Sequence, residues 1–164
     1  MWDMEDVFMK KLSFSHKLTL SALVMALYVA IMAVTQGFAF GQFQVRIATS
    51  LYALAGVFPF LVLPLGFANF LSNALLGGLG ALDMAGGMLI GWITSGIIAL
   101  TRRSRFAPII TVLTITFVTG LGVASWLSYL LNVPYPVMAA SLLVGQFICG
   151  LVGALLLTAL KKRL

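Results

Sequence analysis

The fold is decided by residues 47–100, IATSLYALAGVFPFLVLPLGFANFLSNALLGGLGALDMAGGMLIGWITSGIIAL, which contain one charged residue, Asp83. A helix that crosses a bilayer needs about 20 mostly apolar residues, so this run is too long for one crossing. Pro59 and Pro64 mark one turn inside it, and a Gly-rich segment just before Asp83 marks another. The run therefore divides into three helices, expected at about 47–58, 61–76 and 84–100.

Three further apolar runs flank this stretch, at about 18–38, 106–131 and 134–160. The chain of 164 residues is 62% hydrophobic and 9% charged, which leaves too little polar surface for a soluble globule. We therefore expect an all-α integral membrane protein, a six-transmembrane-helix bundle that forms a single membrane domain over residues 1–164. The expected helices lie at about 17–38, 47–58, 61–76, 84–100, 106–131 and 136–160.

Basic residues give the expected orientation. Nine of the ten fall in three clusters beside the apolar runs: Lys10, Lys11 and Lys17; Arg102, Arg103 and Arg105; Lys161, Lys162 and Arg163. Such clusters stay on the cytoplasmic side during insertion, and an even number of crossings must separate two of them. We expect a multi-pass protein of the cell membrane, in contact with lipid, with both termini cytoplasmic. Scattered clusters of this kind do not indicate a nucleic-acid partner.

Sequence motifs for catalysis and for nucleotide hydrolysis are absent. The chain has no GxxxxGK[ST] loop, no HExxH pair and no nucleophile elbow. Its one cysteine, Cys149, lies in an apolar run, so neither an intrachain disulfide nor a thiolate metal site is expected. The first apolar run lacks a convincing cleavage site and is expected to remain as an anchor. We expect a protein that is not an enzyme and has no cofactor or metal.

Two charged residues depart from the general pattern. Asp83 is the only acidic residue after position 6, and a carboxylate at membrane depth costs about 2.5–3.5 kcal/mol. It is a candidate ligand-binding residue, and capping of the following helix from an aqueous loop is the alternative. Arg46 is the basic residue outside the three clusters. Three roles remain open for Arg46: ligand binding, pairing with Asp83 and contact with lipid headgroups.

Carboxamide side chains are the next candidates. Asn69 and Asn73 are four residues apart and share one helix face, while Gln42 and Gln44 alternate along an extended segment. Carboxamides present donors and acceptors that suit a planar heterocycle. Hydrogen bonding between helices is the alternative role.

Aromatic residues lie at the same expected end of the bundle. Trp126 and Tyr129 stand near the outer end of the fifth expected helix, where stacking on a ligand and an interfacial aromatic belt are both open. With the charged and carboxamide residues above, they predict a polar cavity that opens outward.

Small residues form a stripe on the first expected helix. Ala22, Ala26 and Ala30 recur at every fourth position, which allows another helix to approach closely. Docking of a partner protein and packing inside the bundle are both open.

Segment 42–87 combines several short motifs. These are Gln44-Val45-Arg46-Ile47, then Asn69, then Gly78-Leu79-Gly80 with Asp83, and Gly86-Gly87. Together they resemble the QueT family of queuosine-precursor transporters, which are S-components of energy-coupling factor (ECF) transporters. The length and the six-helix plan fit the same family.

The resemblance implies a substrate-binding membrane subunit of an ABC importer, which captures a 7-deazaguanine base at the extracellular face. Substrate-binding candidates are then Gln44, Arg46, Asn69, Asn73, Asp83 and Trp126, and Ala22, Ala26 and Ala30 would dock onto a transmembrane coupling subunit that bears two ATPase subunits. In one departure, Ala48-Thr49 stands where the family usually has Ser-Glu. The alternatives are an S-component for another small heterocyclic vitamin, or a stand-alone secondary transporter that couples to a cation at Asp83.

Overall fold

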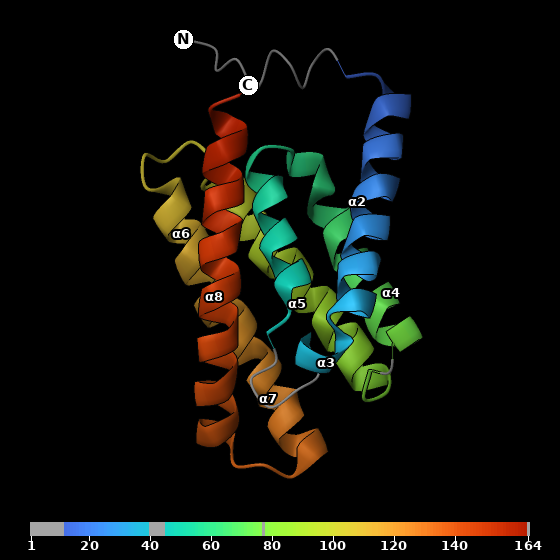
Figure 1. Ribbon diagram of the computed structural model, residues 1–164, viewed down its shortest axis with the longest axis vertical. Helices are drawn as coiled ribbons and strands as arrows, with labels where there is room; N and C mark the ends of the chain where they lie inside the picture. Colours follow the sequence, from blue (N-terminus) through green and yellow to red (C-terminus); the bar gives the residue numbers. More distant parts are fainter. Residues whose placement is uncertain (1–11, 40–44, 77, 164) are drawn as a thin grey trace.

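The structure is a computed structural model that describes residues 12–39, 45–76 and 78–163 (Figure 1). Its regular elements are all helical over these residues, which confirms the all-helical, six-helix prediction. Five apolar helices are long enough to cross a membrane, and a sixth is shorter. In chain order the elements are α2 (Phe14–Val34), α3 (Gln36–Ala39), η1 (Ile47–Gly56), η2 (Pro59–Leu61), α4 (Val62–Leu76), α5 (Ala81–Leu100), α6 (Ala107–Leu113), η3 (Thr114–Thr119), α7 (Gly120–Leu131) and α8 (Tyr135–Lys161).

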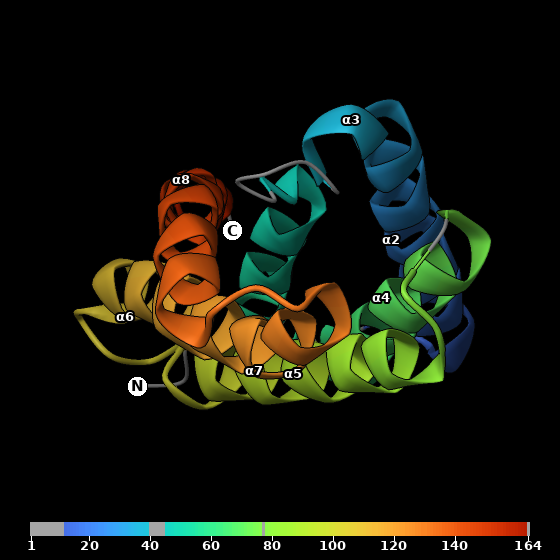
Figure 2. The same ribbon diagram turned by 90° about the horizontal axis from the view of Figure 1, so that it is seen from below.

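The short helix, η1, is a 3₁₀ helix of 10 residues. A 3₁₀ helix rises about 2.0 Å per residue, so η1 is about 20 Å long and does not span a hydrocarbon core of about 30 Å. Most of its residues are buried, and it lies inside the bundle between α2 and α8 (Figure 2). Small residues permit this position: a Cβ on Gly56 would lie 2.9 Å from Leu157 Cδ1 of α8.

Two other helices differ from their expected form. The helix expected over 17–38 is divided, because α2 ends at Val34 and a turn at Thr35 leads into α3. The helix expected over 106–131 contains one π-helical stretch, η3, between α6 and α7. Such π-helical turns arise from local packing inside an otherwise regular helix.

Tight turns join the helices at the end opposite the chain termini in Figure 1. Gly80, with φ of 97°, precedes α5, and this left-handed conformation suits a residue without a Cβ. Asn132, with φ of 52°, ends α7, and Pro134 follows just before α8. Asparagine tolerates the left-handed region better than most residues, and residues 132–134 turn the chain from α7 into α8.

The described basic residues of all three clusters lie at the other end of the bundle. Lys161 Nζ donates to the Arg102 carbonyl oxygen at 2.6 Å, which joins the end of α8 to the α5–α6 turn. Arg102 and Arg103 line a groove together with Pro59. Lys17 Nζ lies 6.0 Å from the ring centroid of Phe60, the residue that follows Pro59. The described members of the three clusters therefore share one end of the bundle, as the charge pattern predicts.

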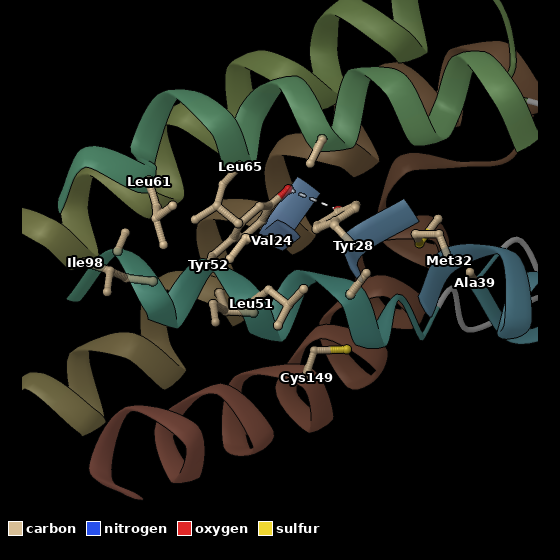
Figure 3. Packing of buried hydrophobic residues seen from close by; sticks show 14 residues of the cluster. Val24, Tyr28, Met32, Ala39, Leu51, Tyr52, Leu61, Leu65, Ile98 and Cys149 are labelled. Atoms are coloured by element: carbon tan, nitrogen blue, oxygen red, sulfur yellow. Dashed lines mark hydrogen bonds between the residues drawn. The ribbon is translucent and has the colours of Figure 1, made fainter. Parts of the chain in front are cut away.

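The main apolar core lies where α2, η1, α4, α5 and α8 meet (Figure 3). Leu61 of η2, Leu65 of α4 and Ile98 of α5 are fully buried there beside two tyrosines, Tyr28 and Tyr52. Large apolar residues on the outward helix faces, such as Leu89 and Leu155, are exposed. Such an exterior suits a lipid environment.

Candidate functional site

The site begins at Arg46, immediately before η1, at the end opposite the basic clusters. Its side chain is only 3% exposed, and Nη1 donates to Asn73 Oδ1 of α4 at 3.2 Å. Asn73 Nδ2 donates in turn to the backbone oxygen of Asp83 at 3.2 Å. Because guanidinium only donates and a carbonyl only accepts, these two contacts fix the orientation of the Asn73 carboxamide.

Asp83 stands in the first turn of α5 and is 1% exposed. One carboxylate oxygen, Oδ1, accepts from Trp126 Nε1 of α7 at 3.0 Å. The other, Oδ2, accepts from the backbone N–H of Leu79 at 3.3 Å. A negative charge at a helix N-terminus is also favoured by the helix dipole. The carboxylate thus joins the α4–α5 turn to α7 at the start of α5.

The alternative role of Asp83, capping of α5 from an aqueous loop, needs adjustment. The residue does not lie in an aqueous loop, because it is buried. Gly80 occupies the N-cap position of α5, and Asp83, in the first turn, accepts from the N–H of Leu79, which precedes the helix.

Two glycines of α5 make room for the surrounding side chains. A Cβ on Gly87 would lie 2.9 Å from both Asn69 Oδ1 and Asn73 Nδ2. A Cβ on Gly86 would lie 3.0 Å from the indole ring of Trp126. The absence of these Cβ atoms therefore lets two carboxamides and one indole approach α5 closely.

Asn69 belongs to a second chain of hydrogen bonds. Its Nδ2 donates to Tyr52 Oη at 2.7 Å, and Tyr52 Oη lies 3.3 Å from Tyr28 Oη of α2. The two tyrosine rings are stacked with centroids 6.0 Å apart, and Figure 3 shows their hydroxyls facing each other. Among the described residues, no group donates to Asn69 Oδ1. The site is thus connected to α2.

Thr49 and Gln146 form a third contact beside Arg46. Thr49 Oγ1 lies 2.8 Å from the Arg46 backbone oxygen and 2.9 Å from Gln146 Oε1 of α8. Both side chains are fully buried. Arg46 is therefore linked to α4 through its side chain and to α8 through its backbone and Thr49.

Comparison with protein families identifies the chain. A family model for the QueT transporter matches residues 18–162. The chain belongs to the QueT transporter family. It is a membrane transport protein, which confirms the prediction that it is not an enzyme. Neither the curated proteins nor the solved structures contain a match to this QueT transporter.

The structure of this QueT transporter brings five of the predicted site residues to one end of the bundle: Arg46, Asn69, Asn73, Asp83 and Trp126. Gln42 and Gln44 lie outside the described residues. Tyr129 is 77% exposed on α7. Its exposure fits the interfacial aromatic belt that the sequence left open.

Three buried residues of the site were not predicted: Tyr28, Tyr52 and Gln146. Each is a polar side chain within an apolar run, and that isolation is the signal that was available. In addition, Thr49, part of the departure from the expected pattern, contacts Gln146. A neutral pair of side chains therefore occupies this part of the site.

The predicted docking residues lie on the outer face of α2. Ala22, Ala26 and Ala30 are exposed, whereas Val24 and Tyr28, on the opposite face, are buried. Packing inside the bundle, the alternative role of this stripe, does not occur in this chain.

Proposed function

We propose that this QueT transporter is the substrate-binding S-component of an ECF importer and captures a queuosine precursor, a 7-deazaguanine base. The observation that supports this function best is the buried network of Arg46, Asn73, Asp83 and Trp126. Polar groups are costly to bury inside a membrane protein, and such residues are retained where they have a function. Here four helical segments contribute to one network.

The groups of this network complement a flat nitrogen heterocycle. Arg46 supplies donors for a ring carbonyl, and the Asp83 carboxylate supplies acceptors for ring or exocyclic N–H groups. The carboxamides of Asn69 and Asn73 offer both kinds of group. The Trp126 indole, which lies against Gly86, provides an aromatic surface for stacking.

The proposed orientation places the basic end and both termini in the cytoplasm and the polar network near the extracellular face. Substrate would enter from outside and bind next to Asp83. A buried site of few polar groups with apolar surroundings is the usual form of a small-molecule site.

The exposed alanine stripe supports the proposed partners. Ala22, Ala26 and Ala30 leave a shallow face on α2, along which a transmembrane coupling subunit can approach closely. Two ATPase subunits on that coupling subunit would supply the energy, because this chain contains no nucleotide-binding motif.

Reconstitution in liposomes tests this function. With labelled 7-deazaguanine base outside, we expect binding by the isolated chain, and uptake only when the coupling subunit, both ATPases and ATP are present. ATP-independent uptake by the chain alone would contradict the proposal. It would instead support a stand-alone secondary transporter, which the isolated buried carboxylate of Asp83 motivates.

Competition for binding tests the substrate class. Ala48-Thr49 lacks the carboxylate of the usual QueT pattern, so another small heterocyclic vitamin is the alternative ligand. Binding of a labelled vitamin of this kind that excess 7-deazaguanine does not reduce would reassign the substrate while the S-component role is kept.

A further inference from the structure

We propose that Gln146 is a positioning residue of the ligand site, which holds Arg46 in place through the hydroxyl of Thr49. Gln146 lies on α8, far in sequence from Arg46 and Thr49. This inference rests on the proposed function, because ligand affinity is the property that it predicts.

The burial of Gln146 indicates a role beyond helix packing. Thr158, another polar residue of α8, donates to the Ala154 carbonyl of its own helix at 2.8 Å. Gln146 instead extends across to η1 and contacts Thr49. Burying a carboxamide has a cost that its hydrogen bonds must offset, and the Thr49 contact across to η1 is one of the interactions that does so.

The direction of the hydrogen bonds follows from counting hydrogens. Thr49 has one hydroxyl hydrogen but two oxygens within reach, those of the Arg46 backbone and of Gln146. The Arg46 carbonyl can only accept, whereas the two ends of a glutamine carboxamide are interchangeable by rotation. Both contacts are satisfied when the Gln146 N–H donates to Thr49 Oγ1 and the Thr49 hydroxyl donates to Arg46.

This chain of hydrogen bonds fixes the start of η1. The Arg46 carbonyl also accepts from the Thr49 backbone N–H at 2.8 Å, and no side chain caps this helix end. Arg46 is thus held at its backbone by Thr49 and at its guanidinium by Asn73. A change at Gln146 removes the α8 partner of the Thr49 hydroxyl. The hydroxyl can then rotate away from the Arg46 carbonyl, which weakens the first restraint and lets the guanidinium shift relative to a ligand.

Four variants of the full chain test this inference: Gln146→Met, Thr49→Val, their combination, and Thr49→Ser. Binding of 7-deazaguanine base is measured by calorimetry, and melting temperature is recorded for each. We expect Gln146→Met and Thr49→Val each to weaken binding about tenfold, the effect of one lost hydrogen bond. The double variant should be no weaker than either single variant, because both act through one contact.

Thr49→Ser is the conservative variant. It keeps the hydroxyl and should bind the base with wild-type affinity. Leu142→Met, at a buried position one turn before Gln146, is the control for packing of α8. Unchanged affinity in Gln146→Met, or additive losses in the double variant, would overturn the inference. A wild-type chain that fails to bind the base would instead contradict the proposed function itself, and the inference with it.

Discussion

Gly87 shows at the scale of one residue how the site depends on close packing. Asn69 and Asn73 reach across from α4 because α5 has no side chain at this position. Their carboxamides in turn contact Tyr52 and Arg46. A single added methyl group therefore affects both hydrogen-bond chains of the site.

Gly87→Ala is expected to weaken ligand binding at least tenfold and to destabilise the fold by about 1–3 kcal/mol, the cost of overpacking. The new Cβ would lie 2.9 Å from both carboxamides, which must move. Gly96→Ala is the matched control, since a Cβ at this position of α5 has no neighbour within 4 Å. Binding calorimetry and thermal unfolding measure both effects. Equal affinity and equal thermal stability of Gly87→Ala and Gly96→Ala would show that the close approach of the two carboxamides to Gly87 is unimportant.

Asp83→Asn tests the charge of the buried carboxylate. An asparagine can still accept from Trp126, but its NH₂ group would then face the Leu79 N–H, which is also a donor. We expect a loss of about 1.5–3 kcal/mol in ligand binding, the range for hydrogen bonds to charged groups. Ser125→Ala, at an exposed position of α7, should bind normally. Wild-type affinity of Asp83→Asn in the same titration would exclude a role for the charge.

The charged residues and the Asn69–Asn73 pair were predictable from the sequence, whereas isolated neutral polar residues were not. Arg46 and Asp83 are conspicuous because their surroundings are apolar and the other charges lie at helix ends. Tyr52 and Gln146 become part of the site only through contacts with Asn69 and Thr49. The Thr49–Gln146 contact joins positions 97 residues apart, and no local pattern encodes it.

At the scale of elements, α2 has two faces with different surroundings. Tyr28 faces inward and connects to the site through Tyr52, whereas the alanine stripe faces outward. A partner that docks on α2 would therefore contact the helix whose other face adjoins the ligand network.

Ala26→Leu should leave folding and ligand binding unchanged, because the position is exposed in the isolated chain. We expect it to abolish co-purification with the coupling subunit, since a larger side chain prevents close helix approach. Ala140→Leu, at an exposed position of α8, serves as the control and should co-purify normally. Equal recovery of the coupling subunit with Ala26→Leu and wild type would exclude the stripe as the docking face.

Helix positions were predictable, but helix types were not. Apolar runs and Pro or Gly breakers indicate where a segment crosses, which is why six helices could be expected. The 3₁₀ segment η1 and the π-helical segment η3 pack closely on α8, where Leu157 and Gly150 lie far away in sequence. Propensity and periodicity contain no information on those contacts.

At the scale of the whole molecule, the arrangement of charges predicts an orientation that labelling can measure. Cys149 is buried, so Cys149→Ala gives a background for single-cysteine variants. In that background, Tyr135→Cys marks the site end and Ser104→Cys the basic end, both at exposed positions. A membrane-impermeant maleimide should label intact cells at position 135 and not at 104. The reverse pattern would place the site in the cytoplasm.

The central claim, that the buried network holds a small heterocycle, is tested most directly by native mass spectrometry of the gently purified chain. We predict one retained molecule of nucleobase-like mass, or a one-to-one mass shift when 7-deazaguanine base is added, and loss of this shift in Arg46→Ala. Repeated spectra of the ligand-free mass, with no shift after addition of 7-deazaguanines, would contradict the account.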